Sequence, residues 1–432
     1  MPLIRTIGRW TMTALVINCI IGSGVFGLPA ELTRLLGRAS PIAIIFAALG
    51  VAVIMACMAE VASQFSEPGG PYQYVRTAFG PFLGIQIGWF HLLSAISGLA
   101  AVFHIFMDYL ATFVSLTTFE RDLLLAIVVA VPTVINCLGV RSGANLSNIL
   151  TVAKTSPLVL LILFGIARYA RQTPMIHASE ITAPGLSNWL RALVFLLFLY
   201  GGWEDSLIIA GEVRDPRRTI PFGLAAGLVG CTAIYVLLQF VTLATIGSNV
   251  TERPLAAVAS VLLGSGGAAF VAIAAMLSAY GWISGSILNG PRLVYSLAAQ
   301  GDFPAVFAKL NPRFNTPGIA IILYALTAWA LAVSGSFLWI VALSASSMIV
   351  YYAASSACLP RLRKLRPNAD AFRVPFGPAL SFVAIGIALV LLTGLKSREI
   401  LLMGVTALIA TANWLWVRHR RTPDALPAKA AH

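Results

Sequence analysis

The sequence predicts an all-α membrane protein with about twelve transmembrane helices, two of which are broken near their middle. Its composition is 59% hydrophobic and only 10% charged, with a mean hydropathy of +0.87, and this is too apolar for a water-soluble globule. Apolar stretches of about 20 residues, the length that crosses a bilayer, recur along the chain. Glycine clusters interrupt two of these stretches, which are about five spans apart.

The predicted spans follow one another and are separated by segments rich in charged residues, proline and glycine. They lie near residues 10–34, 40–64, 82–114, 121–140, 146–168, 190–212, 220–246, 266–298, 317–335, 337–359, 378–395 and 399–417. Between the second and third spans, Tyr72, Tyr74 and Phe79 predict a short segment at headgroup level, with a plain loop as the alternative. We expect a single transmembrane domain over residues 1–432.

The first span contains Gly22, Ser23 and Gly24 near its centre. Each glycine weakens a helix by about 1 kcal/mol relative to alanine, so the helix is expected to open here. An open backbone at bilayer depth is tolerated only where it lines a cavity or is buried in protein. The segment is therefore a candidate binding site, and the alternative is a small-residue notch that lets two helices pack closely.

The sixth span contains a second interruption, at Gly201 and Gly202, within the stretch from Phe198 to Ser206. Paired interrupted helices at corresponding positions of two halves are typical of the substrate site of an inverted-repeat transporter. Glu204 and Asp205 follow this break directly. One of them could instead cap the second half-helix, because an acid near a helix N-terminus is favoured by the helix dipole.

Lys154 is the one lysine that falls well inside a predicted span. A cation at bilayer depth costs roughly 2.5 to 3.5 kcal/mol on insertion scales, so a functional role with a partner is expected. Snorkelling of the amine toward the headgroups is the alternative. His91 and His104 lie on different faces of the third span, so they favour local hydrogen bonds over a metal pair, and a proton relay is the less favoured alternative.

The net charge of +13 follows membrane topology. Basic residues are about twice as frequent on one predicted face as on the other, which places both termini in the cytoplasm by the positive-inside rule. The charge therefore indicates orientation in a lipid bilayer and no nucleic-acid partner. The five cysteines have no paired spacing, so we expect no disulfide framework and no metal site, and nothing indicates a cofactor.

Several motifs, in order along nearly the whole chain, resemble the amino acid–polyamine–organocation (APC) superfamily. They are Ile20–Phe26, Gly69–Tyr72, Phe198–Trp203, Glu212–Pro221, Arg292–Leu293, Asn311–Phe314 and Thr316–Pro317. Within that superfamily the sixth-span motif is most similar to L-type amino acid transporters and their bacterial relatives. The resemblance implies a LeuT-like fold with two inverted five-helix repeats, about 10–168 and 190–359, and two extra helices, about 378–417.

The resemblance also implies roles for residues at the first break. Backbone N–H groups of Ser23 and Gly24 would bind a substrate carboxylate, and carbonyls of Ile20, Phe198 and Gly201 would bind its ammonium. These roles agree with general physics, because the start of a half-helix suits an anion and the end of the preceding half suits a cation. Phe198 would also close the outer side of the site.

The resemblance further implies that the Lys154 amine occupies the place of sodium in sodium-coupled relatives. Its partners would be first-span carbonyls near Gly22 and an eighth-span hydroxyl, with Ser284 and Ser286 as candidates. Glu204 departs from the L-type pattern, in which an amide commonly follows the tryptophan. This departure leaves the preference for neutral over cationic substrates open.

We therefore expect a sodium-independent transporter of neutral L-amino acids in the plasma (inner) membrane, which works by alternating access as an exchanger or with proton coupling. The alternative substrates are cationic amino acids or polyamines, with Glu204 as the counter-charge. A membrane-embedded enzyme is disfavoured because the histidines are scattered and no catalytic constellation can be assembled. A channel or a non-transporting sensor shares these features, and the sequence leaves an accessory subunit open.

Overall fold

The computed structural model is helical throughout most of its length. It describes residues 7–22, 24–65, 70–139, 144–169, 184–207, 213–247, 251–367 and 371–420, with the backbone alone described for 144–154 and 216. Its helices are α1 (Arg9–Ile20), α2 (Gly24–Leu36), η1 (Gly37–Ala39), α3 (Ser40–Ala62), α4 (Gly70–Phe79), α5 (Pro81–Leu110), α6 (Thr118–Cys137), α7 (Ala144–Tyr169), α8 (Leu186–Tyr200), η2 (Trp203–Leu207), α9 (Pro216–Ile246), α10 (Pro254–Ala299), η4 (Ala305–Ala308), α11 (Gly318–Ser334), α12 (Phe337–Leu365), α13 (Gly377–Leu392) and α14 (Ser397–Arg420).

The predicted spans coincide with single helices or with pairs of helices separated by a break. In the described residues, seven helical segments are long and apolar enough to cross a membrane, and three shorter helices are also apolar. The segment expected at headgroup level is the helix α4. The stretch labelled α10 consists of two helical pieces separated by a kink at Gly264, where φ is 75° and ψ is −168°, and the piece after the kink matches the predicted span 266–298. Glycine adopts this backbone conformation without the steric cost of a Cβ.

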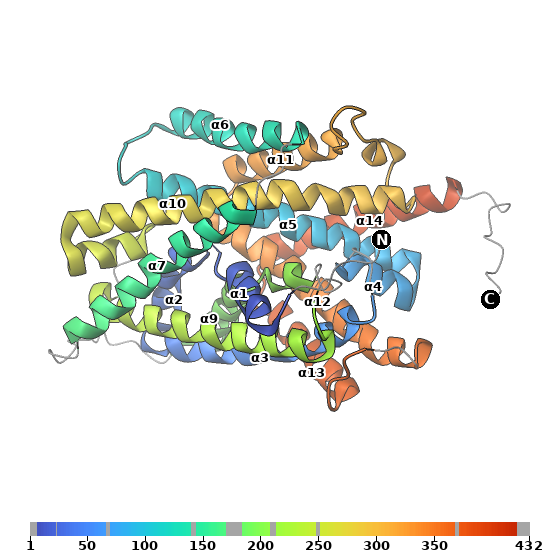
Figure 1. The fold of residues 1–432 in the computed structure, drawn as a ribbon, viewed down its shortest axis with the longest axis horizontal. Helices are drawn as coiled ribbons and strands as arrows, with labels where there is room; N and C mark the ends of the chain where they lie inside the picture. The colour runs from blue at the N-terminus through green and yellow to red at the C-terminus, as the bar shows by residue number, and fades with distance from the viewer. Residues whose placement is uncertain are drawn as a thin grey trace.

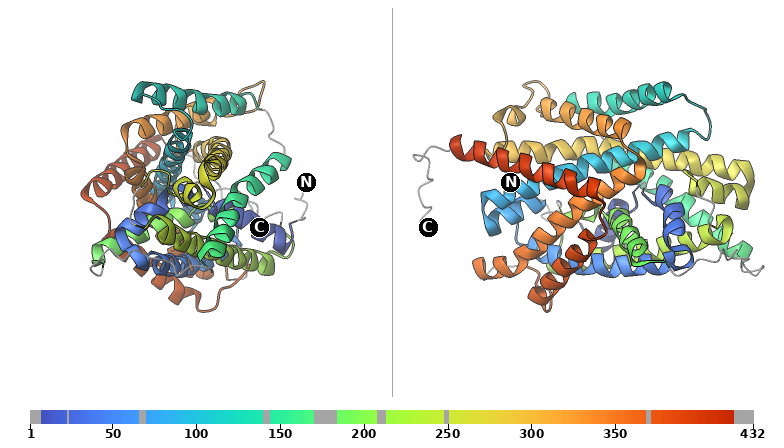
Figure 2. Two further views of the ribbon diagram at one scale, coloured as in Figure 1. Left: turned by 90° about the vertical axis from the view of Figure 1, so that its left-hand side faces the viewer. Right: turned by 180° about the vertical axis from the view of Figure 1, so that it is seen from behind.

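Two groups of helices each pack internally. The first group contains α1, α3, α8 and α9, and the second contains α5, α6, α10 and α11. Figure 1 shows most helices running along the long axis, with α6 and α11 side by side at the upper edge. The end-on view of Figure 2 shows a rounded bundle in cross-section. Helix α12 contacts both groups through α3 and α5, and α7 contacts both through α9 and α10.

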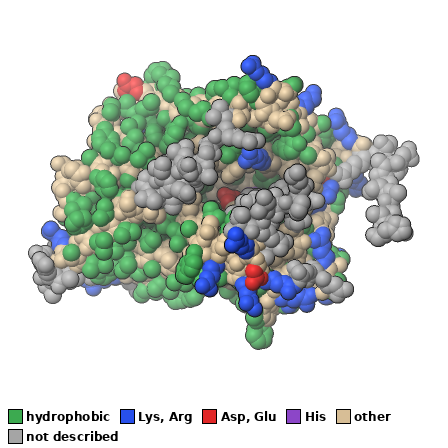
Figure 3. All heavy atoms as spheres, in the orientation of Figure 1, with side chains coloured by type: hydrophobic (Ala, Val, Ile, Leu, Met, Phe, Trp, Pro, Cys, Tyr) green, Lys and Arg blue, Asp and Glu red, His purple; other side chains and the backbone are tan. Residues whose placement is uncertain are grey.

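The outer surface suits contact with lipid. Figure 3 shows hydrophobic side chains over much of one face, with lysines and arginines gathered toward the right-hand end, where α4 and the end of α14 lie in Figure 1. Phe382 is 72% exposed and Leu408 is 71% exposed, on α13 and α14 respectively. Exposed apolar surface on this scale is unfavourable in water. The chain is therefore a multi-pass membrane protein.

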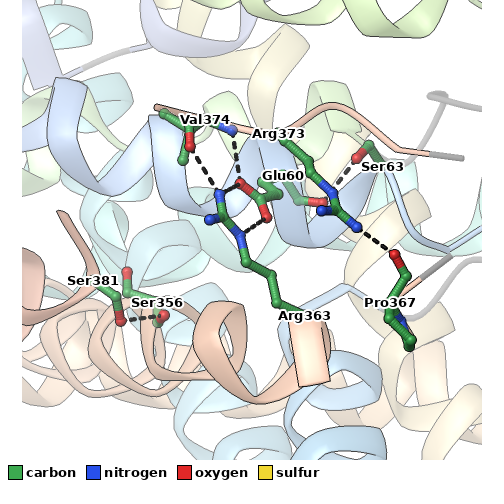
Figure 4. Close-up of polar contacts among 8 residues, drawn as sticks. All are labelled: Glu60, Ser63, Ser356, Arg363, Pro367, Arg373, Val374 and Ser381. Carbon is green, nitrogen blue, oxygen red and sulfur yellow. Dashed lines mark hydrogen bonds and ion pairs between the residues drawn. The ribbon is translucent and has the colours of Figure 1, made fainter. Parts of the chain in front are cut away.

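A buried ion pair ties α3 to α12 and to the segment before α13 (Figure 4). Glu60 is fully buried, and its Oε1 and Oε2 each lie 2.7 Å from the guanidinium of Arg363. The backbone N–H of Val374 donates to Glu60 Oε2 over 2.7 Å, while Arg363 donates to the Val374 carbonyl over 2.8 Å. All the charged atoms thus have close partners, which is the condition under which a buried ion pair is tolerated.

Replacing Glu60 by glutamine tests the importance of this pair. Glu60→Gln leaves the Arg363 charge without its counter-ion, and because the Arg363 side chain is 25% exposed we expect a loss of about 1.5–3 kcal/mol in folding free energy. A thermal-unfolding series in detergent measures this loss as a fall in Tm. The matched control is Asp215→Asn, because its contact to Arg218 is 3.9 Å long and exposed, and it should leave Tm almost unchanged. Equal Tm values for the two variants would contradict the expectation.

Candidate functional site

The first predicted break is present in the structure. Helix α1 ends at Ile20, and Ile21 has φ −73° and ψ 84°, which lies outside the helical region. The Gly22 N–H donates to the Ile20 carbonyl over 2.8 Å, and α2 then begins at the buried Gly24. The first N–H groups of α2 have no partner within their own helix, so they can bind an anion. Ser23, one of the predicted binding residues, lies outside the described residues, as do Gly69 and Glu212 of the motifs.

The second predicted break is also present. Helix α8 ends at Tyr200, Gly201 takes an extended conformation (φ −65°, ψ 167°), and Gly202 has φ +96° before η2 begins at Trp203. Two physical reasons require glycine at position 202. Its positive φ strains any residue with a Cβ, and a Cβ there would lie 2.7 Å from the Cys19 carbonyl oxygen.

The two breaks lie against each other. Gly202 meets the Cys19 carbonyl of α1, and the half-buried Phe198 of α8 lies over the start of α2. A Cβ on Gly24 would lie 3.2 Å from Cε1 of the Phe198 ring. The structure therefore brings together Gly24, Phe198 and Gly201 at the crossing of two opened helices, with Ile20 at the end of α1.

Tyr235 of α9 stabilises both breaks. Its hydroxyl donates to the Ile20 carbonyl over 3.0 Å and lies 3.4 Å from the Leu199 carbonyl. The Ile20 carbonyl thus accepts from both Tyr235 and Gly22, and the Phe198 carbonyl accepts from the Gly201 N–H over 3.1 Å. Sequence reasoning missed Tyr235, although a hydroxyl within the apolar span 220–246 is a usable signal.

The residues predicted to replace a sodium site fall around α7 and α10. Lys154 lies in α7, and its side chain is outside the described part of the chain. Gly22 approaches α10 through Trp282, since a Cβ on Gly22 would lie 4.0 Å from Trp282 Nε1. Ser286 forms a 3.0 Å hydrogen bond with Tyr324 of α11, while Ser284 is half-buried on the same stretch of α10. Trp282 is a second neighbour of the break that sequence reasoning did not identify.

Glu204 points its carboxylate at two tyrosines of α12. The Tyr351 hydroxyl donates to Oε1 over 2.7 Å, and the Tyr352 hydroxyl donates to Oε2 over 2.8 Å. The N–H of Gly202 donates to Oε2 over 3.1 Å. The carboxylate therefore holds the turn between α8 and η2 as well as the neighbouring helix. Asp205, which follows it, is exposed.

Known proteins are similar to this chain over most of its length. The amino acid permease family model matches residues 7–417. The serine/threonine exchanger SteT of Bacillus subtilis (strain 168) is 26% identical over 423 residues, which are 94% of this chain and 95% of that protein. The methylthioribose transporter of the same strain is 24% identical over 408 residues, or 90% and 87%. The b(0,+)-type amino acid transporter 1 of Homo sapiens is 26% identical over 343 residues, or 77% and 70%.

Removing one hydroxyl tests the geometry of the breaks. Tyr235→Phe should weaken substrate binding and transport several-fold, because the ends of α1 and α8 lose a shared donor, while stability falls by only about 1 kcal/mol. Substrate-induced thermal stabilisation and uptake by reconstituted protein measure the two effects. The matched control is Tyr169→Phe, which removes a similar bond to the Ala244 carbonyl far from the breaks. Equal transport losses in both variants would show that Tyr235 has no special role.

Proposed function

The chain belongs to the amino acid permease family, and from this we propose that it is a sodium-independent transporter of neutral L-amino acids that works by alternating access. The family and its relatives are transporters rather than enzymes. By their names, SteT and the b(0,+)-type transporter carry amino acids, and the third relative carries methylthioribose. We propose an amino acid as the substrate and exchange or proton coupling as the mode.

The observation that carries this proposal is the contact between the two broken helices. An α-amino acid has an anionic and a cationic end, and the paired breaks offer N–H groups at the start of α2 beside carbonyls at the ends of α1 and α8. We propose that Ser23 and Gly24 bind the carboxylate, and that carbonyls of Ile20, Phe198 and Gly201 bind the ammonium. For Ile20 this requires exchange of a bond that Tyr235 or Gly22 now makes. Phe198 would act as the lid.

The pattern of helix contacts supports two repeats, of residues about 10–168 and 190–359, that could move against each other. If α1–α2 corresponds to α8–η2, then α3, α5, α6 and α7 correspond to α9, α10, α11 and α12. Contacts then occur in matched pairs, with α1–α9 matching α3–α8, α5–α12 matching α7–α10, and α6–α10 matching α5–α11. Inverted repeats of this kind allow one group of helices to rock against the other around a central site.

We also propose that both termini are cytoplasmic in the plasma (inner) membrane. The basic side chains at the right-hand end of Figure 3 support this orientation, because positively charged segments favour the cytoplasmic side.

Cationic amino acids or polyamines are a second candidate substrate class. The exposed carboxylate of Asp205 next to the breaks favours that class, since it could bind an additional positive charge.

Transport by reconstituted protein tests the proposal. Liposomes that contain the chain and are loaded with unlabelled L-amino acids should take up labelled serine, alanine or leucine, whereas protein-free liposomes should not. Competition with unlabelled leucine and alanine against lysine, arginine and putrescine then separates neutral from cationic substrates. Failure of any L-amino acid to enter under any gradient would overturn the proposal, and stronger competition by lysine, arginine or putrescine would favour the second substrate class.

The lysine of α7 gives a separate prediction. We propose that the Lys154 amine, together with Gly22 and a hydroxyl of Ser284 or Ser286, takes the place of a sodium ion. Lys154→Ala should then remove most transport, because the carbonyls near Gly22 lose the cation that they bind. Replacement of sodium by choline should leave the native protein unaffected. Arg168→Ala, at the end of the same helix, is the control and should retain activity. Strong sodium stimulation of native transport would exclude this role for Lys154.

A further inference from the structure

Glu204 differs from the buried carboxylates of the described residues in the chemistry of its partners. The buried acids each pair with an arginine, namely Glu31 with Arg34, Glu60 with Arg363, Asp108 with Arg121, Asp302 with Arg76 and Glu399 with Arg191. Glu204 is held by two tyrosine hydroxyls and one backbone N–H. Among the described side chains, no lysine or arginine lies within salt-bridge distance of it. Its ionised form is therefore not fixed by a permanent counter-charge there.

Tyrosine partners allow both charge states of a carboxyl group. A tyrosine hydroxyl can donate to a carboxylate, and it can rotate to accept a hydrogen bond from a protonated carboxyl, whereas an arginine can only donate. The two hydroxyls lie 2.7 Å and 2.8 Å from the two Glu204 oxygens, so both oxygens keep a partner in either state. A proton can therefore bind here without leaving an unpaired polar group.

Glu204 lies between an exposed carboxylate and a buried histidine ring. Asp205 is exposed and lies within electrostatic range of Glu204. On the interior side, the Tyr351 ring lies 4.9 Å from the His91 ring of α5. His91 Nδ1 is buried and has no hydrogen-bond partner in the described structure. A buried ring nitrogen without a described partner thus lies behind Tyr351, and an exposed carboxylate lies beside Glu204.

Proton binding at Glu204 would act directly on the second break. The same Oε2 that accepts from Tyr352 also accepts from the Gly202 N–H. An ionised carboxylate holds such donors more strongly than a neutral carboxyl does. Protonation would therefore weaken the hold on Gly202 and change the relative stability of arrangements of the α8–η2 turn.

We propose that Glu204, held by Tyr351 and Tyr352, is the site where this protein binds a proton that crosses the membrane together with its substrate. The proposal rests on the proposed function, because it assigns the coupling ion of the same transport cycle. It differs from the interpretation of Glu204 as a substrate counter-charge, because both carboxylate oxygens are directed at α12. The titratable groups on the elements around it are Asp205 of η2, Cys19 of α1, His91 of α5, Tyr324 of α11, and Tyr351 and Tyr352 of α12.

Two assays on reconstituted full-length protein test the proposal. Counterflow exchange without any gradient reports substrate transport alone, and accumulation driven by a pH gradient, acidic outside, reports proton coupling. For one proton per substrate, a gradient of one pH unit should support up to about tenfold accumulation by the native protein. Glu204→Gln should lose this accumulation, and any loss of counterflow should be smaller than the loss of accumulation. Glu120→Gln, in the exposed first turn of α6 where glutamine keeps the helix cap, should behave as the native protein does.

The possible outcomes distinguish the proposed transport function from the proposed proton site. Absence of counterflow in the native protein would overturn the proposed function, whereas counterflow without accumulation by the pH gradient would overturn the proton site alone. Accumulation by Glu204→Gln at the native level would also overturn it. Should Glu204→Gln fail to fold, Tyr352→Phe supplies the test. It removes one donor to the ionised form, so the pH of half-maximal gradient-driven uptake should rise, and an unchanged pH profile would contradict the proposal.

Discussion

The need to satisfy backbone hydrogen bonds at bilayer depth constrains every feature of this site. A membrane helix satisfies its own peptide groups, and a chain that opens two helices must provide other partners for the groups that it frees. Here the partners come from neighbouring elements. Tyr235 donates to the end of α1 and approaches that of α8, and Glu204 accepts the N–H of Gly202. The remaining donors at the start of α2 are the groups that a substrate can use.

Charge is distributed in two different ways in the molecule. Arginine–carboxylate pairs join segments that are distant in sequence, such as Arg191 with Glu399 and Arg76 with Asp302. Because such pairs are costly to separate once buried, they favour a fixed arrangement of the helices that they join. Beside the opened helices, Glu204 instead has neutral partners. Carboxylates with fixed arginine partners and a carboxylate with neutral partners thus occur in different parts of the same bundle.

The sequence alone could predict the helices and both breaks, because span length, hydropathy and glycine content are local properties. It could not identify the partners of the freed groups. Tyr351 and Tyr352 lie 147 and 148 residues from Glu204, and Tyr235 lies 215 residues from Ile20. Such pairings depend on which faces of which helices meet, and an apolar span carries little information about that. The kink in α10 falls at Gly264, just before the predicted span 266–298, which agrees with glycine as a local signal for a helix end.

The approach of Gly202 to the Cys19 carbonyl has a consequence for how selectivity could evolve. No side chain separates the two main chains there, so their spacing is set by peptide geometry, which mutation can hardly adjust. Under the proposed function, the main-chain groups beside this seam would recognise only the zwitterionic portion common to every α-amino acid. Discrimination among cargoes would then fall to residues such as Phe198, Asp205 and Trp282, which can be exchanged without disturbing the seam.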